Sequence, residues 1–200
     1  MLIAARESFA AAARKRLPYD AEVEYLQSSG TQYIDTGVGG GSETDFELRA
    51  MMPSPTGRQI AGARSTSSNF RYVQIQSNPV GNIYFGYNNS TSFGSYKTLS
   101  GWMTLRAAGN RCYVDDVLLH TFTAAQFASA GTIWLHATHG VSTQGTAVLR
   151  ISTARVWSGG ALVRDYIPVR VGTTGEMYDR ISGTFATRVG TFVVGPDKTA

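Results

Sequence analysis

Apolar and polar residues alternate along most of the chain, and this period of two predicts β-strands with one buried face. Phe46, Leu48 and Ala50 alternate with polar neighbours over residues 45–50. The same pattern recurs at four further places, centred on Val73 and Ile75, Ile83 and Phe85, Met103 and Leu105, and Ile133 and Leu135. A run rich in β-branched residues over 147–157 predicts one long strand.

Turn-forming residues separate these runs. They gather at 39–42, 53–57, 88–90 and 158–160, and Asp115-Asp116 predicts a tight hairpin turn. Beyond the N-terminus, only Thr123 to Ser129 has a pattern that allows a short helix. The sequence therefore predicts an all-β fold of two packed antiparallel sheets. We favour a jelly-roll sandwich, with a different sandwich topology as the alternative.

The first seventeen residues have a helical pattern instead. Leu2, Ala5, Phe9, Ala12 and Ala13 fall on one stripe at helical spacing, and Pro18 ends the segment. So short a helix needs a surface to lie on. We expect residues 1–17 to dock onto another protein, with Leu2, Phe9, Arg14, Lys15 and Arg16 as the anchor. A frayed or self-packed end is the alternative.

Charge is concentrated in this N-terminal segment. The chain of 200 residues has a formal net charge of +4. Residues 1–16 supply +3 of it and leave +1 for the rest. A nearly neutral body does not predict a nucleic-acid groove. No apolar run approaches the roughly 18–20 residues of a membrane-spanning helix, so we expect no membrane insertion.

The usual catalytic and metal-binding patterns are missing. No closely spaced Glu-x-Asp-x-x-Glu run occurs, as sandwich glucanases carry, and Arg49 follows Asp45 and Glu47 on the same strand face, which favours a solvated surface. His136 and His139 are three residues apart, a spacing that points them to opposite faces of a strand. Cys112 lies in a predicted strand, where we expect a small core residue. We therefore predict no catalytic residues, no metal site and no cofactor.

One set of polar and aromatic residues is a candidate binding surface. If Val73, Phe85, Ile133 and their apolar neighbours face the core, six residues face outward: Tyr72, Gln74, Gln76, Tyr84, Trp134 and His136. Aromatic rings beside amides suit sugars, because the ring covers the apolar face and the amides bond the hydroxyls. The same residues also suit a subunit interface or an ordinary surface.

Three stretches of the chain resemble a known family. They are Val23 to Gly37 (VEYLQSSGTQYIDTG), Arg155 to Arg170 (RVWSGGALVRDYIPVR) and Gly175 to Phe185 (GEMYDRISGTF), followed by Phe192 to Asp197. Together with Tyr113-Val-Asp-Asp-Val117, they are similar to laminin-G-like, concanavalin A-like jelly-roll proteins of bacteriophages and prophages of gut bacteria. The resemblance spans residues 22–197 and implies the jelly-roll fold. It also implies a phage-like origin.

The resemblance and the charge distribution together lead to one functional hypothesis. Residues 1–17 form a basic helical anchor, 18–21 a linker, 22–197 the jelly roll and 198–200 a polar tail. We expect a non-enzymatic structural protein on the exterior of a phage particle: a capsid decoration, head fibre or tail component. It would bind other virion proteins through residues 1–17, form a homo-oligomer, with a trimer favoured, and hold a cell-surface glycan weakly. A free carbohydrate-binding module or lectin is the alternative, and a glycoside hydrolase is less favoured.

Overall fold

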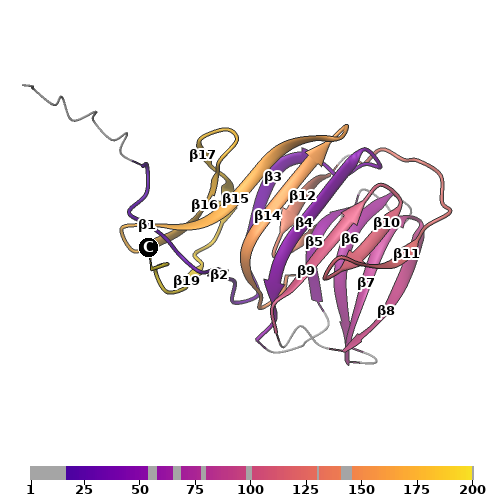
Figure 1. Ribbon diagram of the computed structural model, residues 1–200, viewed down its shortest axis with the longest axis horizontal. Coiled ribbons are helices and arrows are strands. Elements are labelled where there is room, and N and C mark those ends of the chain that lie inside the picture. Colours follow the sequence, from indigo (N-terminus) through magenta and orange to yellow (C-terminus); the bar gives the residue numbers. More distant parts are fainter. Residues whose placement is uncertain are drawn as a thin grey trace, which may run out of the picture.

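The computed structural model describes residues 17–53, 58–64, 69–77, 80–97, 101–129, 131–140 and 146–199. Side chains are described for these residues except Arg58, Phe70, 74–81 and 91–97. Within this part, the chain folds into two β-sheets packed face to face, with no helix (Figure 1). The predicted all-β sandwich is confirmed. The N-terminal helix was expected over residues that lie almost wholly outside the described part.

The front sheet of Figure 1 has β14 and β4 at its centre. Its main path runs in this order: β11 (Val117–Thr121), β10 (Arg111–Val114), β9 (Met103–Ala108), β4 (Thr44–Met51), β14 (Arg150–Ser158), β15 (Ala161–Val171), β16 (Thr174–Asp179) and β17 (Thr184–Phe185). Three short strands extend it: β1 (Ala21–Glu22) on β15, β2 (Leu26–Gln27) on β14, and β19 (Val193–Val194) on β2. Sandwich pairing thus begins at Ala21, opposite Arg170.

The back sheet has β12 and β5 near its centre. Its order is β18 (Thr187–Val189), β3 (Tyr33–Gly39), β12 (Thr132–Leu135), β5 (Arg58–Arg64), β6 (Phe70–Ser77), β7 (Val80–Asn88) and β8 (Ser90–Lys97). The short strand β13 (Thr138–His139) pairs with β5 in the parallel sense, whereas the other described pairs are antiparallel.

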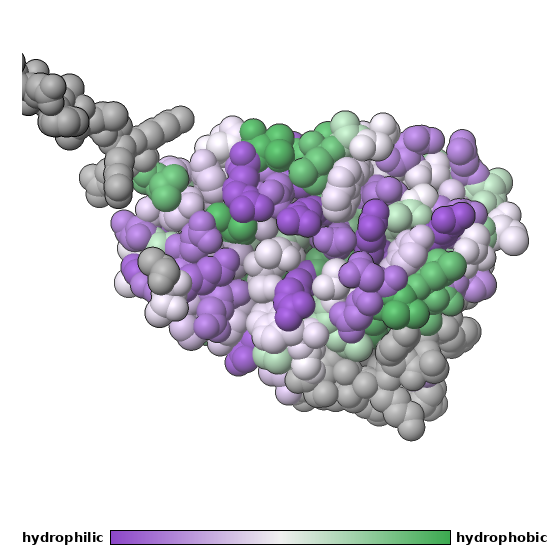
Figure 2. Space-filling model, viewed as in Figure 1, coloured by the Kyte–Doolittle hydropathy of each residue, from purple (hydrophilic) through white to green (hydrophobic). Residues whose placement is uncertain are grey.

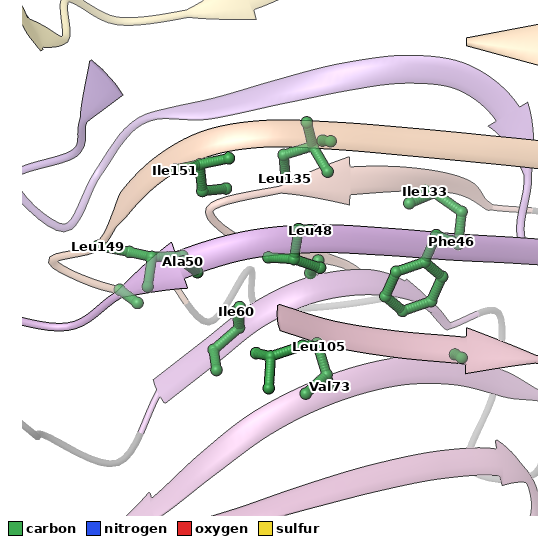
Figure 3. Packing of buried hydrophobic residues seen from close by; sticks show 14 of the residues in the cluster. Phe46, Leu48, Ala50, Ile60, Val73, Leu105, Ile133, Leu135, Leu149 and Ile151 are labelled. Atoms are coloured by element: carbon green, nitrogen blue, oxygen red, sulfur yellow. The ribbon is translucent and has the colours of Figure 1, made fainter. Parts of the chain in front are cut away.

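The apolar halves of the alternating strands meet between the sheets. Along β4, Phe46, Leu48 and Ala50 are buried while their neighbours are less so. They face Ile133, Leu135, Ile60 and Val73 of the back sheet (Figure 3). Cys112 belongs to the same core, as predicted, and burial raises its pKa to about 11. Period-two patterning thus identified the core-facing residues whose side chains are described, although Met103 is only partly buried.

The predicted turns at described residues form, whereas the one predicted at 53–57 lies outside the described part after Pro53. Asp115 and Asp116 join β10 to β11 with φ of 47° and 63°, and Asn88 turns the chain into β8 with φ of 55°. Asn and Asp tolerate this left-handed conformation better than most residues do. The short helix allowed over Thr123–Ser129 is not formed, and that expectation was wrong. Its backbone bonds elsewhere instead, because the carbonyl of Phe127 accepts the amide of Ser42 at 3.0 Å.

The outer face of the front sheet has a row of paired charges. Glu47 lies between Arg106 and Arg155, at 4.0 and 3.5 Å, and Asp165 lies between Arg155 and Arg180, at 3.3 and 2.5 Å. Hydrophilic side chains accordingly spread across this face in Figure 2. Glu47 is therefore a half-buried carboxylate paired with exposed arginines, which fits the solvated surface expected for this strand, whereas Asp45 pairs with buried Arg71.

Candidate functional site

Four of the six residues expected to face outward are in fact buried. Tyr72, Tyr84, Trp134 and His136 are between 0 and 8% exposed. The side chains of Gln74 and Gln76 lie outside what the structure describes. The expectation of exposure was thus wrong for the four, and they do not form an open platform on which a sugar ring could stack.

Trp134 is covered by rings on both of its faces. Tyr33 stacks on it with centroids 3.7 Å apart, and His139 stacks on it at 4.1 Å. The indole nitrogen donates to Thr132 Oγ1 at 3.2 Å. In the strand pairing, Trp134 is opposite Gly62, which in turn is opposite Tyr72. A residue without a side chain between two aromatic ones leaves room for both rings against the sheet, and this explains their burial.

His136 lies in the interior near β2 and β14, fully buried. Its Nδ1 is 3.1 Å from Ser28 Oγ, and its ring packs on Phe192 at 4.8 Å. The Ser28 hydroxyl donates to the carbonyl of Ala147, so Nδ1 carries the hydrogen in the contact with Ser28. Burial lowers the pKa of His136 to about 3. A buried, neutral histidine of this kind has a structural role, not a ligand-binding one.

A polar pocket of about 240 Å³ opens at another place, where β15, β16 and β17 of the front sheet meet β3 and β18 of the back sheet. Its lining comes from three separate segments of the chain: Asp35 to Gly37, Arg164 and Tyr166, and Asp179 to Thr187. The first two segments, and the third as far as Phe185, belong to the motifs that carry the family resemblance. Sequence reasoning treated these motifs as structural and named none of their residues as a site.

The first wall of the pocket is the end of β3. Gly37 has φ of +68°, which turns the strand here, and its amide donates to Asp35 Oδ1 at 2.9 Å. This bond fixes the carboxylate of half-buried Asp35 toward the pocket. The carbonyl of Thr36 accepts Arg164 Nε at 3.1 Å from the opposite wall.

Arg164 and Asp179 form the floor of the pocket. Arg164 Nη1 donates to the carbonyl of Val163 at 2.8 Å. Asp179, whose side chain is 2% exposed, accepts the amides of Asp165 and Ile181 on Oδ1, at 2.9 and 3.1 Å. Its Oδ2 lies 3.8 Å from Arg164 Nε, too far for a hydrogen bond, and has no other partner in the described part of the chain. Asp179 thereby compensates the charge of Arg164, while the carbonyls of Thr36 and Val163 hold the guanidinium by hydrogen bonds.

Tyr166 supplies a hydroxyl behind this floor, 3.4 Å from the carbonyl of Thr36. Its pKa is raised to about 12, mainly by burial. Arg164 lowers the pKa, while Asp179 and Asp35 contribute to raising it. The phenol therefore stays protonated at every physiological pH, and it responds to all three charges of the pocket.

The rim of the pocket is rich in hydroxyls. Ser182, Thr184 and Thr187 supply them, and those of Ser182 and Thr184 are 2.8 Å apart. Phe185 is 39% exposed, but it is paired with Tyr178 and its ring meets that of Tyr178 edge-on at 5.7 Å, so the ring lies on the sheet face opposite to Asp179 and Thr184. Carboxylate and hydroxyl acceptors and guanidinium and hydroxyl donors are thus presented within one small cavity, with the ring of Phe185 beside it.

Comparisons with known proteins identify a solved structure with a similar fold. No protein-family model matches the chain. No curated protein is similar to it in sequence. Among solved structures, the chain is similar to a crystal structure from Bacteroides ovatus named a "putative carbohydrate binding protein", with a TM-score of 0.65 and 11% identity. The match covers 89% of this chain and 61% of that one, so this chain spans about three fifths of the neighbour's length.

The described residues contain neither a membrane-crossing helix nor a cluster of metal ligands. No helix among them is long and apolar enough to cross a membrane. No group of three or more His, Cys, Asp or Glu side chains among them is placed to hold a metal ion.

Proposed function

We propose that this β-sandwich is a carbohydrate-binding module that holds one sugar ring in the pocket beside Phe185. The observation that carries the proposal is the composition of that pocket. Asp35, Arg164 and the rim hydroxyls of Ser182, Thr184 and Thr187 bring the donors and acceptors that sugar hydroxyls need into one small cavity. The name of the Bacteroides ovatus neighbour agrees with this function, and its fold supports the same architecture.

The size of the pocket supports a single or terminal sugar unit. Pockets for drug-sized ligands have about 300–1,000 Å³. The volume here, about 240 Å³, is smaller. A small, polar pocket gives a sugar little apolar contact, so we expect weak binding that gains strength through several copies.

The proposal is for binding without turnover. Glycosidases use two carboxylates, one of which donates or accepts a proton at the glycosidic bond. Two carboxylates line this pocket, but Asp179 is held by two backbone amides and lies against Arg164. We assign it to compensating the charge of Arg164, which leaves Asp35 without a catalytic partner.

The test is a binding titration with neutral sugars, followed by NMR or calorimetry. Replacing Thr184 by Ala removes a rim hydroxyl on the pocket face, and we expect it to weaken binding about tenfold, a loss of about 1.4 kcal/mol. Val193→Ala is the matched control, because Val193 is 55% exposed but lies outside the pocket.

Two outcomes contradict the proposal. Sugar binding that is absent, or that is unchanged by Thr184→Ala, would contradict a sugar site in this pocket. Release of reducing sugar by the wild-type protein, from an oligosaccharide it binds, would favour the glycoside hydrolase alternative instead.

The role in a phage particle stays a prediction. It rests on the family resemblance and on residues 1–16, among them Leu2, Phe9, Arg14, Lys15 and Arg16, which lie outside the described residues. We propose that this segment attaches the module to other virion proteins and supports a trimer. A module with weak single sites gains most from such clustering, so display on a particle and sugar binding are compatible.

A further inference from the structure

We infer that the pocket prefers neutral sugars to acidic ones, and that Asp35 determines this preference. The inference rests on the proposed function, because it concerns the ligand class of the same site. It arises from the count of charges around the cavity: two carboxylates, Asp35 and Asp179, face one guanidinium, Arg164.

The guanidinium is already engaged within the protein. Arg164 Nε donates to Thr36, Nη1 donates to Val163, and Asp179 lies 3.8 Å away. Recognition of a carboxylate by arginine works best through two parallel N–H groups. Here, the edge of the guanidinium that includes Nε is bonded to the backbone, so Arg164 is poorly placed to grip the carboxylate of an acidic sugar.

Asp35 is the carboxylate of the pocket whose charge no described side chain compensates. Asp179 is compensated by Arg164, whereas no ion pair to Asp35 is found among the described residues. One oxygen of Asp35 accepts the amide of Gly37. The carboxylate can still accept hydrogen bonds from sugar hydroxyls, because each of its oxygens has two lone pairs.

All three charges lie close enough to Tyr166 to affect its pKa: Arg164 lowers it, and Asp179 and Asp35 raise it. A ligand carboxylate brought into this cavity also meets the carboxylate of Asp35, which has no ion pair among the described residues. In a partly desolvated pocket such repulsion is stronger than in bulk water. A neutral sugar has hydroxyls that donate to Asp35 and meets no such repulsion.

The experiment compares matched sugars that differ only at C6. The methyl glycosides of glucose, galactose and mannose are titrated beside the corresponding methyl uronosides, at low ionic strength and pH 7. With the wild-type protein, we expect the best neutral glycoside to bind at least tenfold more tightly than its uronoside. The difference should shrink in 0.5 M salt, which screens charges over a few ångströms.

Asp35→Asn separates charge from hydrogen bonding. Asparagine keeps an oxygen for the Gly37 amide, so the turn is preserved, but the negative charge is lost. We expect the variant to reduce the ratio of the uronoside Kd to the glycoside Kd about tenfold. Asp116→Asn is the control: it removes an equal charge from a turn outside the pocket, at a φ of 63° that asparagine tolerates, and should leave this ratio unchanged.

The outcomes distinguish this inference from the proposed function. If a uronoside binds as tightly as its glycoside, or if Asp35→Asn weakens both equally, the charge preference is overturned while sugar binding stands. If no glycoside or uronoside binds at all, both the proposed function and this inference are contradicted.

Discussion

At the scale of single residues, His136 links stability to pH. It is buried against Ser28 and Phe192, and its pKa falls to about 3, from 6.5 for a free side chain. The unfolded chain therefore binds a proton near pH 6.5 that the folded protein does not accept until near pH 3. Stability from this group is complete above pH 6.5 and is lost as the pH falls from 6.5 toward 3.

We predict that the free energy of unfolding falls by about 2 kcal/mol between pH 7 and pH 5 because of this one group. Urea unfolding at the two pH values measures it. In this window most carboxylates of the unfolded chain remain ionised, so the histidine dominates. His136→Phe should remove most of the dependence, whereas the exposed His120→Gln should retain it. An equal dependence in His136→Phe and wild type would contradict the assignment.

The sequence predicted the burial of Cys112 correctly but predicted exposure for Tyr72, Tyr84 and Trp134, which are buried. Alternation tells which side of a strand points away from the core, and Trp134 does alternate with Ile133 and Leu135. It does not tell what covers that side. Tyr33 and His139, which stack on Trp134, come from β3 and β13, and only the folded chain brings them there. Exposure therefore could not be read from the period of two.

At the scale of elements, the packing of the back sheet depends on Gly62 in β5. Its φ is +141°, a conformation that side chains rarely adopt, and a Cβ placed there would lie 2.5 Å from Tyr72 Cα. Gly62 also separates the rings of Trp134 and Tyr72 along one row of the sheet. Glycine is needed here for both the backbone conformation and the space.

We predict that Gly62→Ala destabilises the protein by roughly 2–4 kcal/mol, combining backbone strain with a shift of β6. Thermal or urea unfolding measures the effect. Gly101→Ala is the control, since a Cβ at Gly101 meets nothing within 4 Å and its φ is ordinary. That variant should be neutral or slightly stabilising. Equal stability of both variants would show that β5 adapts freely.

At the scale of the whole molecule, the sandwich could be predicted from the sequence but the pocket could not. Alternation and turn residues specify strands and their buried faces, which suffices for two packed sheets. The pocket needs Asp35, Arg164 and Asp179 together, although 129 residues separate the first two. A charged residue inside a strand, such as Arg164 between Val163 and Tyr166, was the available signal. The motifs that carry the family resemblance include these residues, but they do not indicate that the residues meet in the fold.

A second long-range feature, Arg71, joins the two sheets. It projects from β6 of the back sheet and is 1% exposed. Its Nε donates to the carbonyl of Thr44 at 3.1 Å, Nη1 to the carbonyl of Gly109 at 2.5 Å, and Nη2 to Asp45 Oδ1 at 3.3 Å. All three acceptors belong to β4 or to the turn after β9, in the front sheet. Burial lowers the pKa of Arg71 to about 10, so the side chain remains charged at pH 7.

We predict that Arg71→Ala lowers the free energy of unfolding by about 3–5 kcal/mol, because it leaves buried acceptors without donors and Asp45 without its partner. Arg71→Lys should recover only part of this loss, since one ammonium cannot reproduce the fork of guanidinium nitrogens. Arg155→Ala is the matched control: Arg155 also pairs with two carboxylates, but it is 45% exposed, so its loss should cost about 0–1 kcal/mol. Chemical unfolding of the three variants, followed by intrinsic fluorescence, ranks them. A loss in Arg71→Ala no larger than in Arg155→Ala would mean that apolar packing alone holds the sheets together.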